Sequence, residues 1–291
     1  MDPEMPPWPG LAGFAREVSL PASGLKLFYF EAGQPEAPPA VLVHGLGDEA
    51  DTWRHILPRL AEHYRVAAFD LPGFGRSDPS PKGYSLPFFQ DTLLEFLDAI
   101  GMERPLVVGH SLGALIAHST ALRAPKRFGR LALIAGGLAV RSQRLDWLSL
   151  AFLVPGLGEF LYQRLSKDPQ AAYQSLQPYY ASLDGMPADE RAFLFERVNQ
   201  RVASAKQQRA FLGTLRSLAA WITAQQKGLG ERLGGFNLPT TIAWGQADRV
   251  NPAVNGEYLA QLQPSARLVL IPGAGHNLQQ ENPQELLAQL L

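Results

Sequence analysis

The sequence predicts an α/β fold in which a mostly parallel sheet is flanked by helices and interrupted once by a helical insertion. In the first half of the chain, short apolar runs of strand length alternate with segments whose apolar residues recur at helical spacing. The same alternation resumes near the carboxyl end, whereas residues 138–236 contain no segment with the pattern of a strand. Alternating strands and helices of this kind build a parallel sheet with right-handed crossovers.

The composition is that of a globular chain of 291 residues, long enough for one large α/β domain with an insertion. Hydrophobic residues make up 46% and charged residues 18%, which excludes an intrinsically disordered chain. The formal net charge of -1 provides no basic surplus that would favour nucleic acid or an anionic membrane. The absence of cysteine excludes disulfides, thiolate metal sites and cysteine nucleophiles.

Nothing in the sequence indicates export or a membrane span. Residues 1–14 have neither the basic start nor the apolar run of a signal peptide. The longest apolar stretch, residues 147–161, is broken by Pro155, Gly156 and Gly158 and is too short to cross a bilayer. We therefore expect a soluble cytoplasmic protein without a membrane span, and a monomer or homodimer.

Eight strands are predicted, and the first two form a hairpin. Residues 16–20 and 25–33 alternate in polarity and are joined by a Pro-Ala-Ser-Gly turn. The other six are continuous apolar runs, as expected for strands covered on both faces. These runs comprise residues 39–45, 64–73, 105–111, 130–136, 238–245 and 266–273.

Helical spacing of apolar residues predicts the intervening helices and divides the chain into three parts. Residues 85–101 form the first long helix, with Gly101 at its C-cap. Further helices are predicted from residue 112 to about 123, at 169–183, 188–203, 207–226 and 254–261, and from about residue 283. The predicted parts are the first core segment (1–137), the helical insertion (138–236) and the second core segment (237–291).

One serine stands at a tight turn between a predicted strand and a predicted helix. Gly109-His110-Ser111-Leu112-Gly113 fits the pattern Gly-x-Ser-x-Gly, in which the turn strains the serine backbone and lifts its hydroxyl above the sheet. Glycines are needed there because side chains would collide with the neighbouring strand and helix. The context predicts a nucleophilic Ser111, and the alternative is a glycine-lined turn with an incidental serine.

A serine nucleophile needs a general base, and the base needs a carboxylate that fixes its tautomer. His276 lies in a glycine-rich loop after the last strand, near the sheet edge where ligands of parallel sheets bind. Asp248 follows the preceding strand, so the order is Ser111, Asp248, His276, as expected for this fold. As an alternative, Asp248 caps the following helix or pairs with Arg249.

Two backbone N–H groups are predicted to bind the oxyanion of a tetrahedral intermediate. One belongs to Leu112, at the amino end of the helix after the serine. The other belongs to Leu46, in the loop of residues 44–53, where Gly45 and Gly47 allow the backbone to turn.

Two further acids lie in the turn after the fourth strand. We interpret both as structural, with Asp70 accepting backbone hydrogen bonds and Asp78 pairing with Arg76.

Five segments occur in order along the chain: "HGLGDEADTW", "FDLPGFGRSD", "VVGHSLGA", "WGQAD" and "PGAGHNLQQENP". With these segments, the chain resembles the α/β-hydrolase superfamily over nearly its whole length. The resemblance implies an α/β-hydrolase fold with an inserted helical cap, and it implies catalysis without a metal or organic cofactor.

Within that superfamily, the residues favour hydrolysis of a small-molecule carboxylic ester. Epoxide hydrolases and haloalkane dehalogenases use aspartate where this chain has Ser111. Proline iminopeptidase relatives usually have tryptophan where Leu112 stands, and carbon–carbon hydrolases often have asparagine where His110 stands. Large apolar residues at 146–162 suit an apolar acyl or alcohol group, although they could equally pack the insertion onto the core.

Two alternatives stay open. A hydrolase of carbon–carbon bonds in vinylogous diketones would need a cation for the dienoate carboxylate, for which Arg141, Arg144 or Arg191 could serve. The other alternative is a binding protein that keeps the fold but hydrolyses its ligand slowly or not at all.

Overall fold

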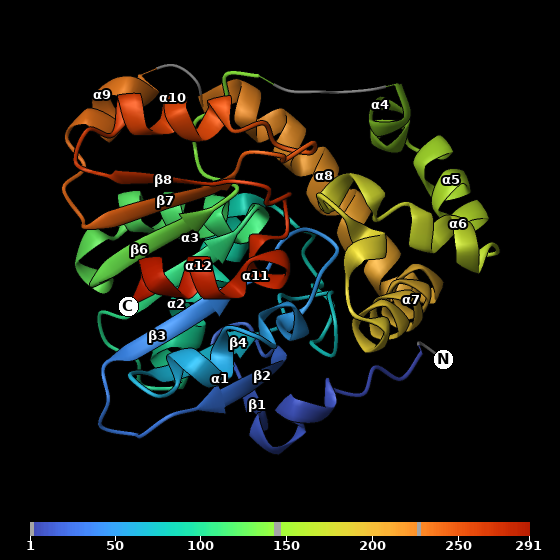
Figure 1. Ribbon diagram of the computed structural model, residues 1–291, viewed down its shortest axis with the longest axis horizontal. Coiled ribbons are helices and arrows are strands. Elements are labelled where there is room, and N and C mark those ends of the chain that lie inside the picture. Colours follow the sequence, from blue (N-terminus) through green and yellow to red (C-terminus); the bar gives the residue numbers. More distant parts are fainter. Residues whose placement is uncertain (1–2, 143–146, 226–227) are drawn as a thin grey trace.

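The computed structural model describes residues 3–142, 147–225 and 228–291, and it is built around one eight-stranded sheet (Figure 1). The strand order is β1-β2-β4-β3-β5-β6-β7-β8. The strands are β1 (Ala15–Ser19), β2 (Lys26–Ala32), β3 (Pro39–Val43), β4 (Arg65–Phe69), β5 (Leu106–His110), β6 (Arg130–Ile134), β7 (Thr240–Gly245) and β8 (Arg267–Ile271).

The prediction of a mostly parallel, eight-stranded sheet is confirmed. The hairpin strands β1 and β2 pair antiparallel, and β2 is antiparallel to β4. All other neighbouring strands are parallel. Almost every residue of β3 to β7 is buried, which explains why these strands are continuous apolar runs and do not alternate in polarity.

Helices cover both faces of the sheet, with α2 and α3 on one face and α1 and α12 on the other (Figure 1). The Ser85 hydroxyl caps α2 by accepting from the Phe88 N–H at 3.3 Å, and Gly101 follows this helix with φ at 64°, as predicted for a C-cap. The core helices are α1 (Leu57–Leu60), α2 (Leu86–Ala99), α3 (Leu112–Arg123), α10 (Val254–Leu262), α11 (Leu278–Glu281) and α12 (Pro283–Leu290).

Between β6 and β7 the described residues contain helices and no strand, as predicted, and α4 to α8 lie to one side of the sheet (Figure 1). These helices are α4 (Trp147–Leu153), α5 (Leu157–Leu165), α6 (Pro169–Gln174), α7 (Ala188–Ala203), α8 (Ala205–Gln225) and α9 (Leu229–Gly234). The prediction of one helix over 169–183 is wrong. Helix α6 ends at Gln174, and a 3₁₀ turn follows at Gln177–Tyr179, where Pro178 lacks the N–H that an α-helix needs.

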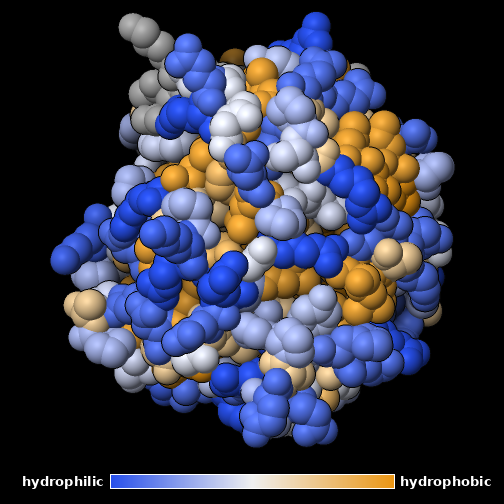
Figure 2. Space-filling model, turned by 90° about the vertical axis from the view of Figure 1, so that its left-hand side faces the viewer, coloured by the Kyte–Doolittle hydropathy of each residue, from blue (hydrophilic) through white to orange (hydrophobic). Residues whose placement is uncertain are grey.

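The core lies on both sides of the sheet and contains large aromatic side chains. Trp53 and Trp244 are almost fully buried, and Phe69 stacks on Phe96 with ring centroids 4.3 Å apart. On the face drawn in Figure 2, hydrophilic residues dominate and hydrophobic ones surface in separate patches. None of the helices in the described part of the chain has the length and apolar character needed to cross a membrane.

Candidate active site

Ser111 sits in a strained turn between β5 and α3. Its φ of 51° and ψ of −112° lie outside the regions that a residue with a side chain ordinarily adopts. The Ser111 N–H donates to the Ile134 carbonyl on the neighbouring strand β6 at 2.8 Å, which holds the turn in place. Such a conformation costs about 1–3 kcal/mol and persists only where surrounding contacts enforce it.

Three glycines allow the chain to approach this turn. A Cβ at Gly109 would lie 2.4 Å from the Gly113 carbonyl oxygen, and a Cβ at Gly113 would lie 2.1 Å from the Val43 carbonyl oxygen. The predicted collisions with helix and strand are therefore confirmed. The third glycine, Gly136, was not predicted from the sequence, and a Cβ there would lie 2.4 Å from the Ser111 carbonyl oxygen.

Replacing Gly113 by alanine is expected to lower the free energy of unfolding by about 3 kcal/mol, because the rigid backbone of β3 occupies the space for the methyl group. Equilibrium unfolding in urea measures the change. Gly234→Ala is the matched control, since an added Cβ there meets no heavy atom within 4 Å. Equal stabilities of the two variants would contradict the steric explanation.

The structure brings His276 and Asp248 together at the carboxyl edge of the sheet. The His276 Nδ1–H donates to Asp248 Oδ2 at 2.8 Å, and both side chains are buried. Asp248 Oδ1 accepts the N–H groups of Val250 and Asn251 at 2.9 and 2.8 Å, so one oxygen shapes the loop while the other orients the imidazole. The alternative in which Asp248 caps the following helix is wrong, because the N-cap position of α10 is Ala253 and no side chain caps it.

His110, the residue before Ser111, connects the serine turn to the His276 loop. Its Nε2–H donates to the His276 carbonyl at 3.0 Å, and the two imidazole rings lie 4.9 Å apart between centroids. Burial, aided by the nearby His276, lowers the pKa of His110 well below its ordinary value, so this ring is neutral at pH 7. This link between His110 and the His276 loop was not predicted from the sequence.

The loop after β3 passes beside Ser111. The His44 Nδ1–H donates to the Gly45 carbonyl at 2.8 Å, while His44 Nε2 accepts the Leu71 N–H at 2.8 Å. Burial lowers the pKa of His44, in keeping with the neutral ring that these contacts require. Since C=O and N–H of a trans peptide point in opposite directions, the Leu46 N–H is directed away from His44. A Cβ at Gly45 would lie 3.3 Å from Ser111 Cβ, so this peptide borders the serine.

Leu112 is the first residue of α3, so its N–H has no acceptor within the helix. Neither this N–H nor that of Leu46 donates to a described residue. The geometry therefore leaves both predicted oxyanion donors unpaired beside the serine turn.

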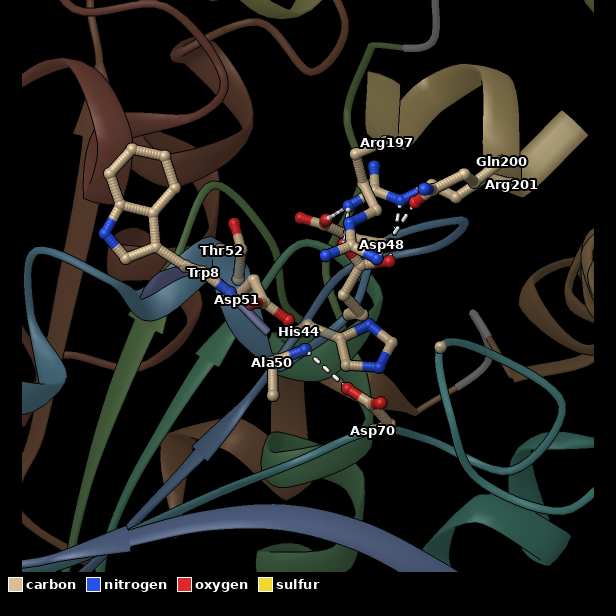
Figure 3. Close-up of polar contacts among 12 residues, drawn as sticks. Trp8, His44, Asp48, Ala50, Asp51, Thr52, Asp70, Arg197, Gln200 and Arg201 are labelled. Carbon is tan, nitrogen blue, oxygen red and sulfur yellow. Dashed lines mark hydrogen bonds and ion pairs between the residues drawn. The ribbon is translucent and has the colours of Figure 1, made fainter. Parts of the chain in front are cut away.

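Asp70 lies at the end of β4 and stabilises the neighbouring loops (Figure 3). It accepts the N–H of Ala50 at 2.7 Å and the N–H of Arg76 at 2.8 Å, which confirms its predicted role as a backbone acceptor. The predicted pair between Asp78 and Arg76 is wrong. The Arg76 Nε binds Asp70 at 2.8 Å, and Asp78 accepts the N–H of Lys26 on the adjacent strand β2 at 2.9 Å.

The insertion also contacts the loop that carries His276. The N–H groups of His276 and Asn277 donate to the Tyr179 carbonyl at 3.0 and 3.1 Å, and the Tyr180 hydroxyl donates to Gln280 Oε1 at 2.8 Å. These contacts fix the loop against the segment after α6. No local sequence signal pointed to Tyr179, because its contribution is a backbone carbonyl.

Three arginines were considered as partners for the carboxylate of a dienoate substrate. Arg141 is exposed, with its guanidinium 5.9 Å from the Tyr258 ring centroid, and Arg191 is exposed on α7. Arg144 lies outside the described residues. Within the described ranges, no group of three or more His, Asp or Glu side chains is arranged to hold a metal ion.

Comparison with known proteins places the chain in a family. It matches the model of the alpha/beta hydrolase fold over residues 38–283. It is 31% identical over 265 residues to a 2-hydroxy-6-oxononadienedioate/2-hydroxy-6-oxononatrienedioate hydrolase of Pseudomonas putida, covering 89% of this chain and 88% of that protein. A solved structure of a membrane phospholipase A aligns with a TM-score of 0.74 and 27% identity, covering 95% of this chain and 84% of that one.

A longer relative matches as well. The chain is 29% identical over 273 residues to the dihydrolipoyllysine-residue acetyltransferase component of an acetoin cleaving system from Pseudomonas putida. That alignment covers 92% of this chain but only 66% of the relative's length. The family match extends over most of the chain and includes the serine turn, the Asp248 loop and the His276 loop. The chain therefore belongs to the α/β-hydrolase fold family.

Proposed function

We propose that this hydrolase cleaves carboxylic esters with small to medium apolar groups through an acyl-enzyme intermediate. Ser111 is the nucleophile, His276 the general base and Asp248 the carboxylate that orients it. The observation that carries the proposal is the 2.8 Å contact between His276 and Asp248 at the same sheet edge as the strained Ser111 turn. A strained serine turn or a His–Asp pair can each occur without a catalytic role. Nucleophilic catalysis by serine requires both at one site.

In the proposed reaction, Ser111 Oγ attacks the ester carbonyl carbon while His276 Nε2 accepts the hydroxyl proton. Asp248 stabilises the resulting imidazolium through Nδ1–H, and the N–H groups of Leu46 and Leu112 bind the oxyanion. The intermediate collapses as His276 protonates the departing alcohol. A water molecule, deprotonated by His276 Nε2, then attacks the acyl-enzyme. His276 gives that proton to Ser111 Oγ as the bond to the acyl group breaks, which releases the carboxylic acid and free Ser111.

Charge near the site favours a neutral substrate. Arg197 and Arg201 of α7 lie beside the loop after β3, but both form ion pairs with the buried carboxylate of Glu49. Arg141 and Arg191 are both exposed, so neither provides a buried cation for a carboxylate. An ester needs no such cation, and the similarity to a phospholipase A structure is in keeping with ester chemistry. In this proposal the insertion, residues 138–236, is a cap that completes the substrate pocket.

Carbon–carbon bond hydrolysis is the second candidate. It is favoured by the 31% identity to a protein named as a 2-hydroxy-6-oxononadienedioate hydrolase. The same Ser111, His276 and Asp248 would serve, with cleavage of a carbon–carbon bond in place of the carbon–oxygen bond. A binding role with little turnover is the third possibility.

Steady-state kinetics on two substrate classes separate these functions. We expect p-nitrophenyl esters, tested from acetate to palmitate, to be turned over with a maximum of kcat/KM at short or medium chain length. A 2-hydroxy-6-oxo-dienoate tested in parallel is expected to react at least about tenfold less efficiently, a difference of about 1.4 kcal/mol in transition-state binding. Faster cleavage of the dienoate would establish the second candidate, and inertness to both would leave a binding role.

A further inference from the structure

A buried cluster of charges joins helix α7 to the loop after β3, here called the oxyanion loop (residues 44–50). Arg201 of α7 donates from Nε to Glu49 Oε2 at 2.8 Å and from one terminal nitrogen to Glu49 Oε1 at 2.7 Å. The same nitrogen contacts Asp48 Oδ1 at 2.5 Å. In Figure 3, the side chains of Arg197 and Arg201 lie close to Asp48, and His44 is nearby. This bidentate geometry fixes both the position and the orientation of the carboxylates.

Glu49 is ionised although it is buried. Glu49 is fully buried, and the Arg201 side chain is 13% exposed. Burial alone would raise the pKa of Glu49, but Arg201 and Arg197 together lower it to about 2. Arg197 Nε lies 3.1 Å from Glu49 Oε1, and its guanidinium also donates to the Pro6 carbonyl. Charges paired in this way hold a rigid geometry, because moving one ion leaves its partner buried and unpaired.

Within the oxyanion loop, Leu46 is very close in sequence to the charged residues of the cluster. Only Gly47, with φ at 74°, separates Leu46 from Asp48. The Asp48 N–H donates back to the Gly45 carbonyl at 3.3 Å, the same oxygen that accepts the His44 Nδ1–H. The Leu46 peptide is therefore held from the core by His44 and from the insertion by the ion pairs of Asp48 and Glu49.

We propose that Arg201 is a positioning residue that aligns the Leu46 N–H for oxyanion binding, so that helix α7 controls the catalytic efficiency of the core. This inference rests on the proposed function, in which that N–H stabilises the tetrahedral intermediate. An oxyanion donor acts only when it points at the developing charge, so its misalignment lowers kcat more than it weakens binding of the neutral ester. Arg201 touches no reacting atom and acts through Asp48 and Glu49.

The test compares Arg201→Met and Arg201→Lys with Arg65→Met. Arg65 forms a half-buried pair with Glu31 at 2.7 Å, at the amino end of β4 on the opposite sheet edge, and serves as the matched control. We expect Arg201→Met to lower kcat on the best p-nitrophenyl ester about 10- to 100-fold, with KM changed less than about threefold. Affinity for a trifluoromethyl ketone, which forms an oxyanion adduct with Ser111, should fall by the same factor as kcat. Arg201→Lys should recover part of both losses.

Two results of the kinetic comparison overturn the proposal. One is an unchanged kcat in a folded Arg201→Met variant, and the other is an equal loss of kcat in Arg65→Met, which would indicate general destabilisation. Labelling by a fluorophosphonate, whose phosphoryl oxygen enters the same oxyanion pocket, makes the test independent of ester turnover. If the wild type hydrolyses no ester but is labelled, the proposed function fails, and the labelling rates of wild type and Arg201→Met still decide the positioning role. If the wild type is not labelled, both proposals fall.

Discussion

Replacing Ser111 by alanine is expected to lower kcat for ester hydrolysis by about 10⁴-fold or more. The variant loses the atom that forms the acyl-enzyme, while the oxyanion donors and the substrate pocket remain. Residual activity then comes only from binding and from direct attack by water. Steady-state release of p-nitrophenol, together with the loss of the pre-steady-state burst, measures the effect.

Ser119→Ala provides the control for this substitution. Ser119 lies two turns further along α3, is buried, and donates to the Ile116 carbonyl at 3.1 Å. Its removal should change kcat less than about twofold, because most substitutions away from a site affect stability and not chemistry. A Ser111→Ala variant that keeps more than a tenth of the wild-type kcat would rule out Ser111 as the nucleophile.

Replacing Asp248 by asparagine is expected to lower kcat by about 10³- to 10⁴-fold at neutral pH. The asparagine carbonyl oxygen can still accept the N–H groups of Val250 and Asn251, so its amide nitrogen turns toward His276. That nitrogen donates, which forces the imidazole into the tautomer with a bare Nδ1 and a protonated Nε2. Nε2 can then no longer accept the Ser111 proton.

The pH dependence of kcat and the equilibrium stability of this variant complete the measurement. Asp78→Asn is the matched control, because Asp78 accepts the Lys26 N–H through one oxygen that an amide also provides. It should keep kcat within about twofold of the wild type. Comparable losses in both variants would show that Asp248 acts by holding the loop and not through His276.

Much of the fold and the positions of the proposed catalytic residues followed from local patterns in the chain. Strands β3 to β7 were recognisable because burial on both faces requires continuous apolar residues. Helix α7 matches its predicted range because its apolar spacing meets no proline or glycine. The serine turn was recognisable because a strained backbone squeezed between strand and helix admits only glycine at Gly109 and Gly113. Asp248 and His276 followed because parallel strands bring their carboxyl ends to one edge.

The contacts that hold the site together could not be read from local patterns. Arg76 pairs with Asp70 and not with the nearby Asp78. The Tyr179 carbonyl accepts hydrogen bonds from the His276 loop, although the two segments are far apart in sequence. The ion pairs between Arg201 and Glu49 join residues 152 positions apart. Propensity and periodicity describe how a segment meets its own neighbours, whereas the partner of a buried charge is the one that packing brings within reach when water is excluded. These polar pairings therefore exist only in the folded chain, where the insertion meets the loops at the carboxyl edge of the sheet.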